Sequence, residues 1–215
     1  VISKRENGYH NIKSVMQTIN LKDEVIIKDT FDDIIIECNN PKIPLDISNT
    51  AYKAVLLIKE RYKIRKGALI QINKNIPTES GMAGGSSNAA TVIKGLNRLW
   101  NLRMTNDEML EIGIKIGADV PFCLTGGTAL VEGIGEKITK LKPFKWKNIL
   151  LVKPDFSMST ALVYKNMKPE YFNKFEDNKI IEYINSHNYN KVALSIANTL
   201  ENVVEEIHPE INEIK

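Results

Sequence analysis

One stretch decides the fold of this chain: Pro77-Thr78-Glu79-Ser80-Gly81-Met82-Ala83-Gly84-Gly85-Ser86-Ser87-Asn88-Ala89-Ala90-Thr91. It follows an apolar run at 68–72 and opens a segment in which apolar residues recur at helical spacing. Glycines let a backbone wrap closely around an anion, and a helix start presents unpaired N–H groups and the positive end of its dipole. The stretch therefore predicts a strand, a phosphate-binding loop and a helix in succession.

Two common phosphate motifs are excluded for this loop. No Gly-Lys-Ser/Thr ends it, so it is not a Walker A loop, and Gly81, Gly84 and Gly85 do not fit G-x-G-x-x-G. An ordinary glycine-rich turn with a serine cap stays open as an alternative. The pattern resembles the central ATP loop of the GHMP kinase superfamily, Pro-x-x-x-Gly-Leu-Gly/Ala-Gly-Ser-Ser.

Composition sets broad limits on the class of protein. With 215 residues, 43% of them hydrophobic and 26% charged, the chain is typical of a globular protein with one large core or two modest ones. No apolar run approaches the length of a membrane span, and a net charge of +3 is too small to indicate nucleic acid. We therefore expect neither a membrane nor a nucleic acid as partner. Cys38 and Cys123 lack CxxC spacing and are expected to be reduced, as in a cytoplasmic protein.

Hydrophobic periodicity and cap residues give a coarse element map. Strands are predicted at 22–28, 33–38, 67–73, 126–133 and 148–153. Helices are predicted at 50–62, 86–100, 106–115, 160–166, 177–186, 189–197 and 200–214. Asn49 is the expected cap of the first helix, and Thr105 with Glu108 forms a capping-box signature for the third. This irregular mixture indicates an α+β fold, with a domain change near 148–158.

Asp119 is the candidate for acid–base chemistry. It stands in the tight sequence Gly117-Ala118-Asp119-Val120-Pro121, where glycine permits an unusual turn and proline restricts the residue before it. A carboxylate fixed there can accept a proton from a substrate hydroxyl, although an aspartate that merely caps a turn has the same local signature. The neighbouring phosphate loop favours the catalytic interpretation, since phosphoryl transfer needs a group positioned near the attacking oxygen.

Aromatic residues and one lysine are candidates for substrate contacts. Tyr9 and His10 can hold a pyrimidine by stacking and by hydrogen bonds to its edge, with Tyr164 on the opposite face. Lys74, just after the predicted third strand, can sit near a diphosphate. Ordinary packing and a solvated lysine remain the alternatives for these positions. No His, Cys or acidic cluster has metal-ligand spacing, so no protein metal site is predicted.

Four segments together resemble one family closely. They are 5–12, 77–91, 117–122 and 132–136, and they resemble, in order, motifs of the 4-diphosphocytidyl-2-C-methyl-D-erythritol kinases of the GHMP superfamily. The resemblance implies a domain like the second domain of ribosomal protein S5 over 1–150, and a ferredoxin-like domain over 151–215, with the active site between them. It implies ATP, with Mg²⁺, phosphorylating the 2-hydroxyl of the cytidylyl substrate. We expect a monomer or a homodimer.

The resemblance also assigns residues. Asp119 matches the catalytic aspartate, Tyr9 and Tyr164 match the aromatics that sandwich cytosine, and His10 matches the residue that reads the cytosine edge. Lys74 matches a lysine at the nucleotide substrate, and Asn49 and Asn88 match asparagines near the adenosine. The triphosphate cradle would comprise Pro77, Gly81, Met82, Ala83, Gly84, Gly85, Ser86 and Ser87. Another GHMP small-molecule kinase, or a non-catalytic nucleotide-binding module, remains an alternative.

Three departures from the family pattern bear on activity. The family has a lysine upstream of the Gly-Tyr-His segment and a C-terminal Gly-Ser-Gly loop, and this chain contains neither, as expected of a piece of a longer protein. Within the cradle, Glu79 and Met82 replace residues that are more often small or leucine. We therefore expect the activity of the complete protein, and little turnover from these 215 residues alone.

Overall fold

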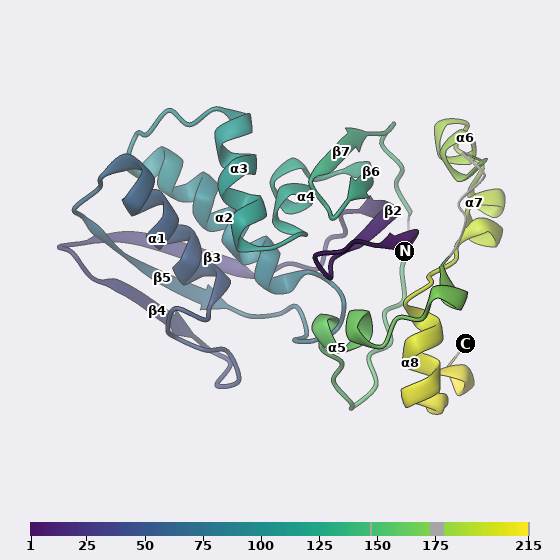
Figure 1. Cartoon of the computed structure of the whole chain (residues 1–215). Helices are drawn as coiled ribbons and strands as arrows, with labels where there is room; N and C mark the ends of the chain where they lie inside the picture. Colours follow the sequence, from purple (N-terminus) through teal and green to yellow (C-terminus); the bar gives the residue numbers. More distant parts are fainter. Residues whose placement is uncertain (147, 173–178, 215) are drawn as a thin grey trace. The chain divides into compact units, whose positions relative to one another are not determined.

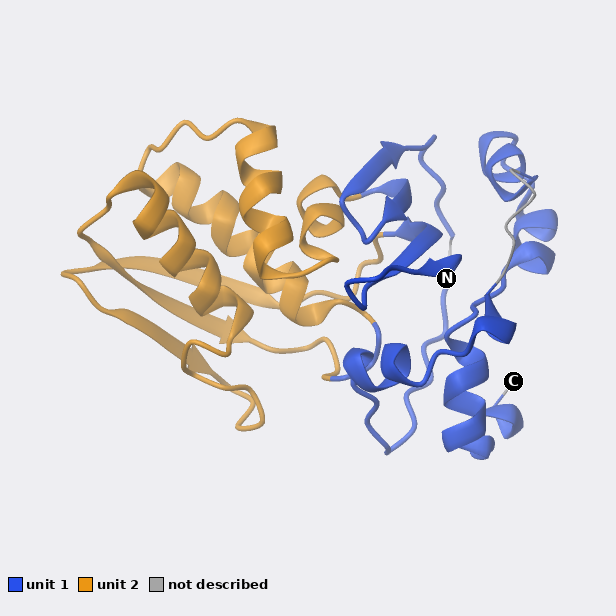
Figure 2. Ribbon diagram, viewed as in Figure 1, with its two compact units in different colours: residues 1–17, 79–81, 127–215 blue, residues 18–78, 82–126 orange. Residues whose placement is uncertain are grey.

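The structure is a computed structural model that describes residues 1–146, 148–172 and 179–214. These residues pack into two units, one comprising 1–17, 79–81 and 127–215 and the other 18–78 and 82–126 (Figure 2). We call the second the loop unit and the first the pocket unit. The domain boundary expected near residue 150 stays a prediction, because these units follow packing within the described part of the chain.

The loop unit is a three-stranded sheet with helices on one face (Figure 1). The strand order is β3-β5-β4, with β3 (Glu24–Thr30) antiparallel and β4 (Ile34–Cys38) parallel to the central β5 (Gly67–Asn73). Parallel neighbours need a crossover, and α1 (Thr50–Tyr62) supplies it between β4 and β5. The other helices of this unit are α2 (Gly84–Leu99), α3 (Asn106–Ile116) and α4 (Val120–Thr125).

Helical spacing of small apolar residues builds the core of the loop unit. Ala51, Ala54, Val55 and Ile58 line one side of α1, and Ala89, Val92, Ile93 and Leu96 line one side of α2. Both stripes are buried in one cluster with Ile70 of β5. Asn49 caps α1 through a bond from the Ala51 N–H, and Thr105 with Glu108 forms the predicted capping box of α3.

The pocket unit contains a four-stranded antiparallel sheet in the order β1-β2-β6-β7. Its strands are β1 (Ser3–Lys4), β2 (His10–Gln17), β6 (Thr128–Gly133) and β7 (Lys137–Lys140). Its helices are α5 (Thr160–Lys165), α6 (Lys179–Asn185), α7 (Tyr189–Ser195) and α8 (Glu201–Ile207), with short 3₁₀ turns at Pro169–Tyr171 and Pro209–Glu213. Small apolar clusters are buried among the described residues of this unit, for example around Phe144 and around Val203.

The α+β fold is confirmed, and several element predictions are corrected. The strand predicted at 148–153 does not form in the described residues, and Leu150 there is 88% exposed. An extended apolar segment becomes a strand only when a neighbour pairs its backbone, and no described strand does so. The helix predicted over 200–214 ends at Ile207, because Pro209 lacks an N–H and restricts the preceding residue.

Five of the described elements were not predicted from the sequence. These are β1, β2, β7, the 3₁₀ turn at Pro169–Tyr171 and the short helix α4, whose second residue is Pro121. Proline suits the first turn of a helix, where its missing N–H has no intrahelical acceptor to lose. β2 has no clean alternation and is a strand because it pairs residue by residue with β6. Residues 177 and 178 of a predicted helix lie outside the described residues.

Gly67 is a position where the fold requires a missing side chain. A Cβ there would overlap the backbone oxygen of Asp33 and the hydroxyl of Thr30, at the start of the central strand β5. We predict that Gly67→Ala lowers the free energy of unfolding by about 3 kcal/mol, measured by urea denaturation. Gly117→Ala is the control, since its Cβ would meet only ordinary contacts, and we expect a change within about 0.5 kcal/mol. Equal effects at both positions would contradict this account.

Candidate functional site

The predicted phosphate loop leads into a helix whose first turn is uncapped. Helix α2 begins at Gly84, Ala83 precedes it in a left-handed conformation with φ 51°, and no side chain caps it. The first helical bond runs from the Ser87 N–H to the Ala83 carbonyl at 2.8 Å. The N–H groups of Gly84, Gly85 and Ser86 therefore have no intrahelical acceptor, at the positive end of the α2 dipole. This is the chemistry of an anion site.

Two glycines let this helix start close to its neighbours. A Cβ on Gly84 would lie 2.9 Å from Lys74 Nζ and 3.1 Å from Ile76 Cγ2. A Cβ on Gly85 would lie 3.3 Å from the Thr50 hydroxyl, which donates a 2.7 Å bond to the Gly85 carbonyl. Larger residues would push the start of α2 away from β5 and α1. Glycine here thus keeps the uncapped N–H groups in a fixed place.

Asp119 lies in the same unit, beside the start of α2. It precedes α4, which packs against both α2 and α3. Two residues earlier, a Cβ on Gly117 would lie 3.9 Å from Ser86 Oγ, so the turn that carries Asp119 adjoins the first turn of α2. The Asp119 side chain makes no capping bond to α4, which removes the simplest structural explanation for it.

Burial raises the pKa of the Asp119 carboxyl above its usual range. A desolvated carboxylate is a stronger base than one in water, because the protonated form is favoured when water is withdrawn. The Cys123 thiol, one turn further along, has its pKa raised to about 12, first by burial and then by the charge of Asp119. Cys123 therefore stays a neutral thiol beside the carboxylate. Of these two groups, Asp119 is the one suited to accept a proton, because its carboxyl is ionisable and burial raises its pKa.

Lys74 and Asn88 lie together in a buried polar cluster. Lys74 Nζ is 2.5 Å from Asp23 Oδ2, and the two side chains are only 4% and 2% exposed. Asn88 donates from Nδ2 to the same carboxylate oxygen at 2.9 Å. Burial by itself would raise the pKa of Asp23, but hydrogen bonds from Lys74, from two backbone N–H groups and from Asn88 outweigh it and lower the pKa. The Lys74 ammonium is thus committed to Asp23 rather than exposed for a phosphate.

Asn49 is committed in a similar way. Its Oδ1 accepts the 2.8 Å bond from the Ala51 N–H, and its Nδ2 donates to the Pro44 carbonyl at 2.7 Å. Both ends of the amide therefore serve the start of α1, and Asn49 is 6% exposed. Its expected contact with the adenosine stays a prediction.

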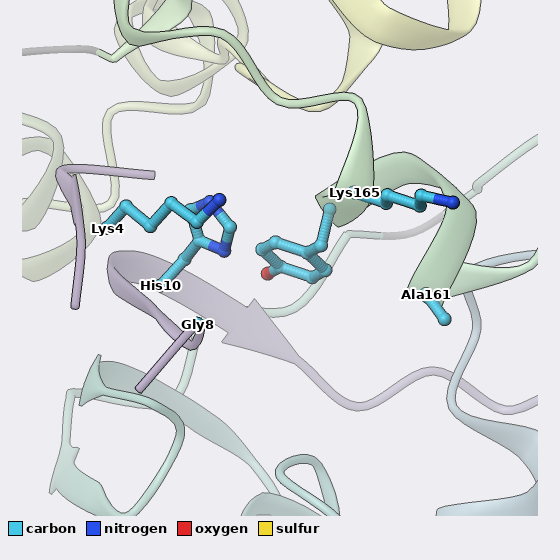
Figure 3. A pocket seen from close by; sticks show the side chains of 6 residues that line it. Lys4, Gly8, His10, Ala161 and Lys165 are labelled. Carbon is cyan, nitrogen blue, oxygen red and sulfur yellow. The ribbon is translucent and has the colours of Figure 1, made fainter. Parts of the chain in front are cut away.

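A separate cavity of about 310 Å³ lies within the pocket unit, lined by Lys4, Gly8, His10, Ala161, Tyr164 and Lys165 (Figure 3). The His10 and Tyr164 rings are 5.2 Å apart between centroids and tilted by 35°, and the His10 and Phe172 ring centroids are 6.2 Å apart in a T-shaped arrangement. His10 is 7% exposed, and its Nε2 has no hydrogen-bond partner within the described part of the chain. A buried polar nitrogen without a partner is costly, which points to a ligand that supplies one.

The charge state of His10 suits recognition of a neutral ring. Burial lowers its pKa first, and the positive charge of Lys4 lowers it further. His10 is therefore neutral at pH 7, with one ring nitrogen as donor and the other as acceptor. Lys4 on β1 and Lys165 on α5 also line this cavity, and the Lys165 side chain extends away from His10 and Lys4 (Figure 3).

The predicted substrate residues are only partly brought together. His10 and Tyr164 share the cavity, whereas Tyr9 does not line it and is 59% exposed. Lys4 and Lys165 were missed by sequence reasoning. Lys4 lies opposite His10 in the β1–β2 pairing, and the glycine at position 8, with φ 85°, is the local signal for that hairpin. Lys165 directly follows Tyr164, but a single lysine carries no signal by itself.

Neither a metal-binding cluster nor a membrane-spanning helix occurs in the part of the chain that the structure describes. Within residues 1–146, 148–172 and 179–214, no group of three His, Cys, Asp or Glu side chains is arranged to hold a metal ion. Over the same residues, no helix has both the length and the apolar character needed to cross a bilayer.

Comparisons with known proteins agree with these features. The family model described as GHMP kinases N terminal domain matches residues 49–127. A 4-diphosphocytidyl-2-C-methyl-D-erythritol kinase of Acetivibrio thermocellus is 47% identical over 216 residues, covering 100% of this chain and 76% of the relative. One from Clostridioides difficile is 47% identical over 218 residues, covering 100% and 74%. The chain thus spans about three quarters of the length of these relatives.

Solved structures give the same result. A crystal structure of 4-(cytidine 5'-diphospho)-2C-methyl-D-erythritol kinase superimposes with a TM-score of 0.72 at 27% identity, covering 100% of this chain and 75% of that one. A mevalonate kinase of Methanococcus jannaschii, at 16% identity and a TM-score of 0.55, shares the fold; it covers 97% of this chain and 80% of that one. With an uncapped glycine-rich helix start, an adjacent buried aspartate and relatives at this level of identity, the chain belongs to the 4-diphosphocytidyl-2-C-methyl-D-erythritol kinase family of GHMP kinases.

Proposed function

We propose that the complete protein transfers the γ-phosphate of ATP to the 2-hydroxyl of 4-diphosphocytidyl-2-C-methyl-D-erythritol, a step of non-mevalonate isoprenoid precursor biosynthesis. The observation that carries this assignment is the buried His10 nitrogen without a partner, facing Tyr164 in a cavity edged by two lysines. That combination fits a nucleobase attached to a diphosphate.

The pocket unit supplies the base and diphosphate contacts in this proposal. The Tyr164 ring offers a stacking face, and the neutral His10 ring pairs with the polar edge of cytosine. Lys4 and Lys165 line the same cavity, and we propose that their positive charges neutralise the diphosphate. Mevalonate and homoserine carry no base, so a kinase for either would leave the His10 nitrogen buried and unsatisfied. The cavity therefore favours the cytidylyl substrate over those of other GHMP kinases. Tyr9, whose side chain is largely exposed, is proposed as the second stacking face.

The loop unit supplies the ATP contacts. The N–H groups of Gly84, Gly85 and Ser86 bind phosphate oxygens, and the α2 dipole offsets charge that develops on the leaving β-phosphate. Mg²⁺ bound with the nucleotide would offset the negative charge of the phosphates. Since the described residues contain no acidic metal cluster, we propose that Mg²⁺ is held mainly by ATP and water, with a hydroxyl such as that of Ser87 as a protein ligand.

Asp119 orients the attacking hydroxyl and takes its proton. A tertiary alcohol is a weak acid, so full deprotonation before attack is costly. In a loose transition state the proton leaves late, when the forming bond to phosphorus has made the oxygen more acidic. A carboxylate whose pKa is raised by burial is a better acceptor for that proton than an exposed one.

We further propose that the enzyme is cytoplasmic and either monomeric or homodimeric. Light scattering of the full-length protein would distinguish the monomer from the homodimer.

Removal of the Asp119 charge is expected to cause a large loss of turnover without a loss of ATP binding. In a coupled ADP-release assay on the full-length protein, Asp119→Asn should lower kcat by about 10²–10⁴, while the Kd for ATP changes little. Cys123→Ser is the nearby control, since its neutral thiol has no role in the proposed step, and its kcat should stay within about threefold. An active Asp119→Asn enzyme would overturn the role of Asp119.

The same Asp119→Asn variant has a predicted effect on stability. Because burial raises the pKa of Asp119, the folded state holds this proton more tightly than the unfolded state does. The free energy of unfolding therefore falls as the pH rises from the unfolded-state pKa of Asp119 through its raised folded-state pKa. Above the raised pKa the wild type buries a charge that the variant lacks. Asp119→Asn should therefore melt at the same or a higher temperature at pH 7, with the difference shrinking below about pH 4, where both states are protonated. A lower melting temperature at pH 7 would instead indicate a structural role.

His10→Phe tests the assignment of the cavity. The variant keeps an aromatic ring against Tyr164 and Phe172 but removes both ring nitrogens. We expect the KM for the cytidylyl substrate to rise about tenfold or more, while the KM for ATP stays within twofold. Tyr9→Phe, which removes only an exposed hydroxyl, should leave both constants nearly unchanged. A rise in the KM for ATP instead would contradict the cavity assignment.

The alternative of a non-catalytic nucleotide-binding module is separable by ligand-induced stabilisation. Under our proposal, cytidine diphosphates and ATP each raise the melting temperature of the full-length protein. A module that only senses ATP would be stabilised by ATP and not by cytidine diphosphates.

A further inference from the structure

Asp23, just before strand β3, is among the most buried carboxylates of the loop unit and has no role in the steps above. Its side chain is 2% exposed and accepts four hydrogen bonds. Oδ1 accepts from the backbone N–H groups of Asn75 at 2.7 Å and Ile76 at 2.8 Å. Oδ2 accepts from Lys74 Nζ at 2.5 Å and Asn88 Nδ2 at 2.9 Å. These four donors satisfy the acceptor sites of one carboxylate.

The four donors stand at the two ends of the phosphate loop. Lys74, Asn75 and Ile76 directly follow β5, where the chain leaves the sheet. Asn88 lies in the second turn of α2, after the loop has ended. One carboxylate therefore ties the exit of β5 to the start of α2, and the residues between them form the loop. The tie also acts through Lys74, whose Nζ is 3.4 Å from Asn88 Oδ1.

The cluster also abuts the first residue of the helix. A Cβ on Gly84 would lie 2.9 Å from Lys74 Nζ, so the Lys74 side chain packs directly beneath the uncapped turn. If the ammonium lost its partner, it would turn toward water or toward the Gly84 backbone. Either movement displaces the N–H groups that face the phosphates. Net stabilisation alone is a weak explanation for this pair, because buried ion pairs often contribute little beyond well-packed apolar residues.

We infer that Asp23 is a positioning residue of the nucleotide site, which holds both ends of the phosphate loop so that the N–H groups at the start of α2 converge on one anion. This inference rests on the proposed ATP-binding function. Anion sites built from backbone donors depend on preorganisation, and a displacement of about 1 Å can cost about 10²-fold. The effect of losing Asp23 therefore falls on ATP and on phosphoryl transfer, rather than on the cytidylyl substrate.

The test uses Asp23→Asn in the full-length protein. Asparagine keeps the shape of the side chain and one of its oxygens. It removes the negative charge that faces the Lys74 ammonium, and it places an NH₂ group opposite the NH₂ group of Asn88. Below the melting temperature of the variant, we expect the KM for ATP to rise at least tenfold and kcat to fall, while the KM for the cytidylyl substrate stays within twofold. A variant with a lowered melting temperature but an unchanged KM for ATP would overturn the inference, because a purely structural residue behaves in that way.

Asp29→Asn is the matched control. Asp29 lies on β3 in the same unit, pairs with Lys66 at 3.0 Å and accepts from Trp100 Nε1 at 2.7 Å. The substitution thus removes another aspartate–lysine pair of this unit, one that is exposed to solvent and has no bond to the loop. We expect the KM for ATP to stay within twofold of the wild type. If Asp29→Asn raised it as much as Asp23→Asn does, the effect would belong to general loosening and the inference would fail.

A second variant and a measurement on the wild type test the inference even if Asp23→Asn does not fold. Asp23→Asn combined with Lys74→Met removes both charges together, so no ammonium stays buried alone, whereas Asn88 still lacks its acceptor. Its KM for ATP should remain raised, and a return to the wild-type value would overturn the inference. In the wild type, a non-hydrolysable ATP analogue should slow hydrogen exchange at Asn75 and Ile76 together with the first turn of α2. Protection of α2 alone would also overturn it.

The two proposals fail in different ways. A full-length wild type that binds ATP but ignores cytidine diphosphates would defeat the substrate assignment and leave the Asp23 test intact, because that test can be read from the Kd for ATP. A wild type that phosphorylates the cytidylyl substrate, alongside an Asp23→Asn variant with normal ATP constants, would defeat only the Asp23 inference.

Discussion

The first turn of helix α2 carries backbone N–H groups that no side chain caps. In α1 and α3 the same need is met from within the chain, by Asn49 and by Thr105 with Glu108. In α2 those groups are left for an external anion, and the surrounding structure keeps them in place. Glycines at 84 and 85 allow close approach to β5 and α1, and the Asp23 cluster joins the two ends of the loop. Residues of the loop unit thus hold in place the N–H groups at the start of α2, which lack acceptors within the helix.

Two aspartates of the loop unit that are shielded from water have pKa values shifted in opposite directions. Asp23 is surrounded by four donors, so its charge is stabilised and its pKa is lowered. Asp119 is desolvated with little to compensate, so its pKa is raised. The first arrangement suits a group that must stay ionised and immobile, and the second suits one that exchanges a proton. The different surroundings of the two carboxylates match the positioning role proposed for Asp23 and the acid–base role proposed for Asp119.

The pocket unit contributes an incomplete hydrogen-bond network. The His10 ring is packed between Tyr164 and Phe172, yet its Nε2 is left without a partner among the described residues. Proteins rarely bury a polar atom in this state, because the desolvation cost is not recovered. Two basic residues, Lys4 and Lys165, are among those that line the same cavity. These features are the reason that a charged ligand with a polar ring edge is favoured over a small aliphatic alcohol.

Local chemistry determined what could be read from the sequence alone. Glycines at 84 and 85, the caps at Asn49 and Thr105, and helical spacing along α1 and α2 act over a few residues, and these predictions agree with the structure. The α+β class followed from the same local signals, and the family resemblance came from short motifs.

Contacts between distant residues were decided only by tertiary structure. Asp23 meets Asn88 across 65 positions of sequence, and Lys74 turns inward only because Asp23 is there to receive it. Strand β2 exists through its pairing with β6, while the apolar run at 148–153 has no partner among the described strands and forms none. A sequence pattern specifies which groups need partners, but the identity of a distant partner depends on how the whole chain packs.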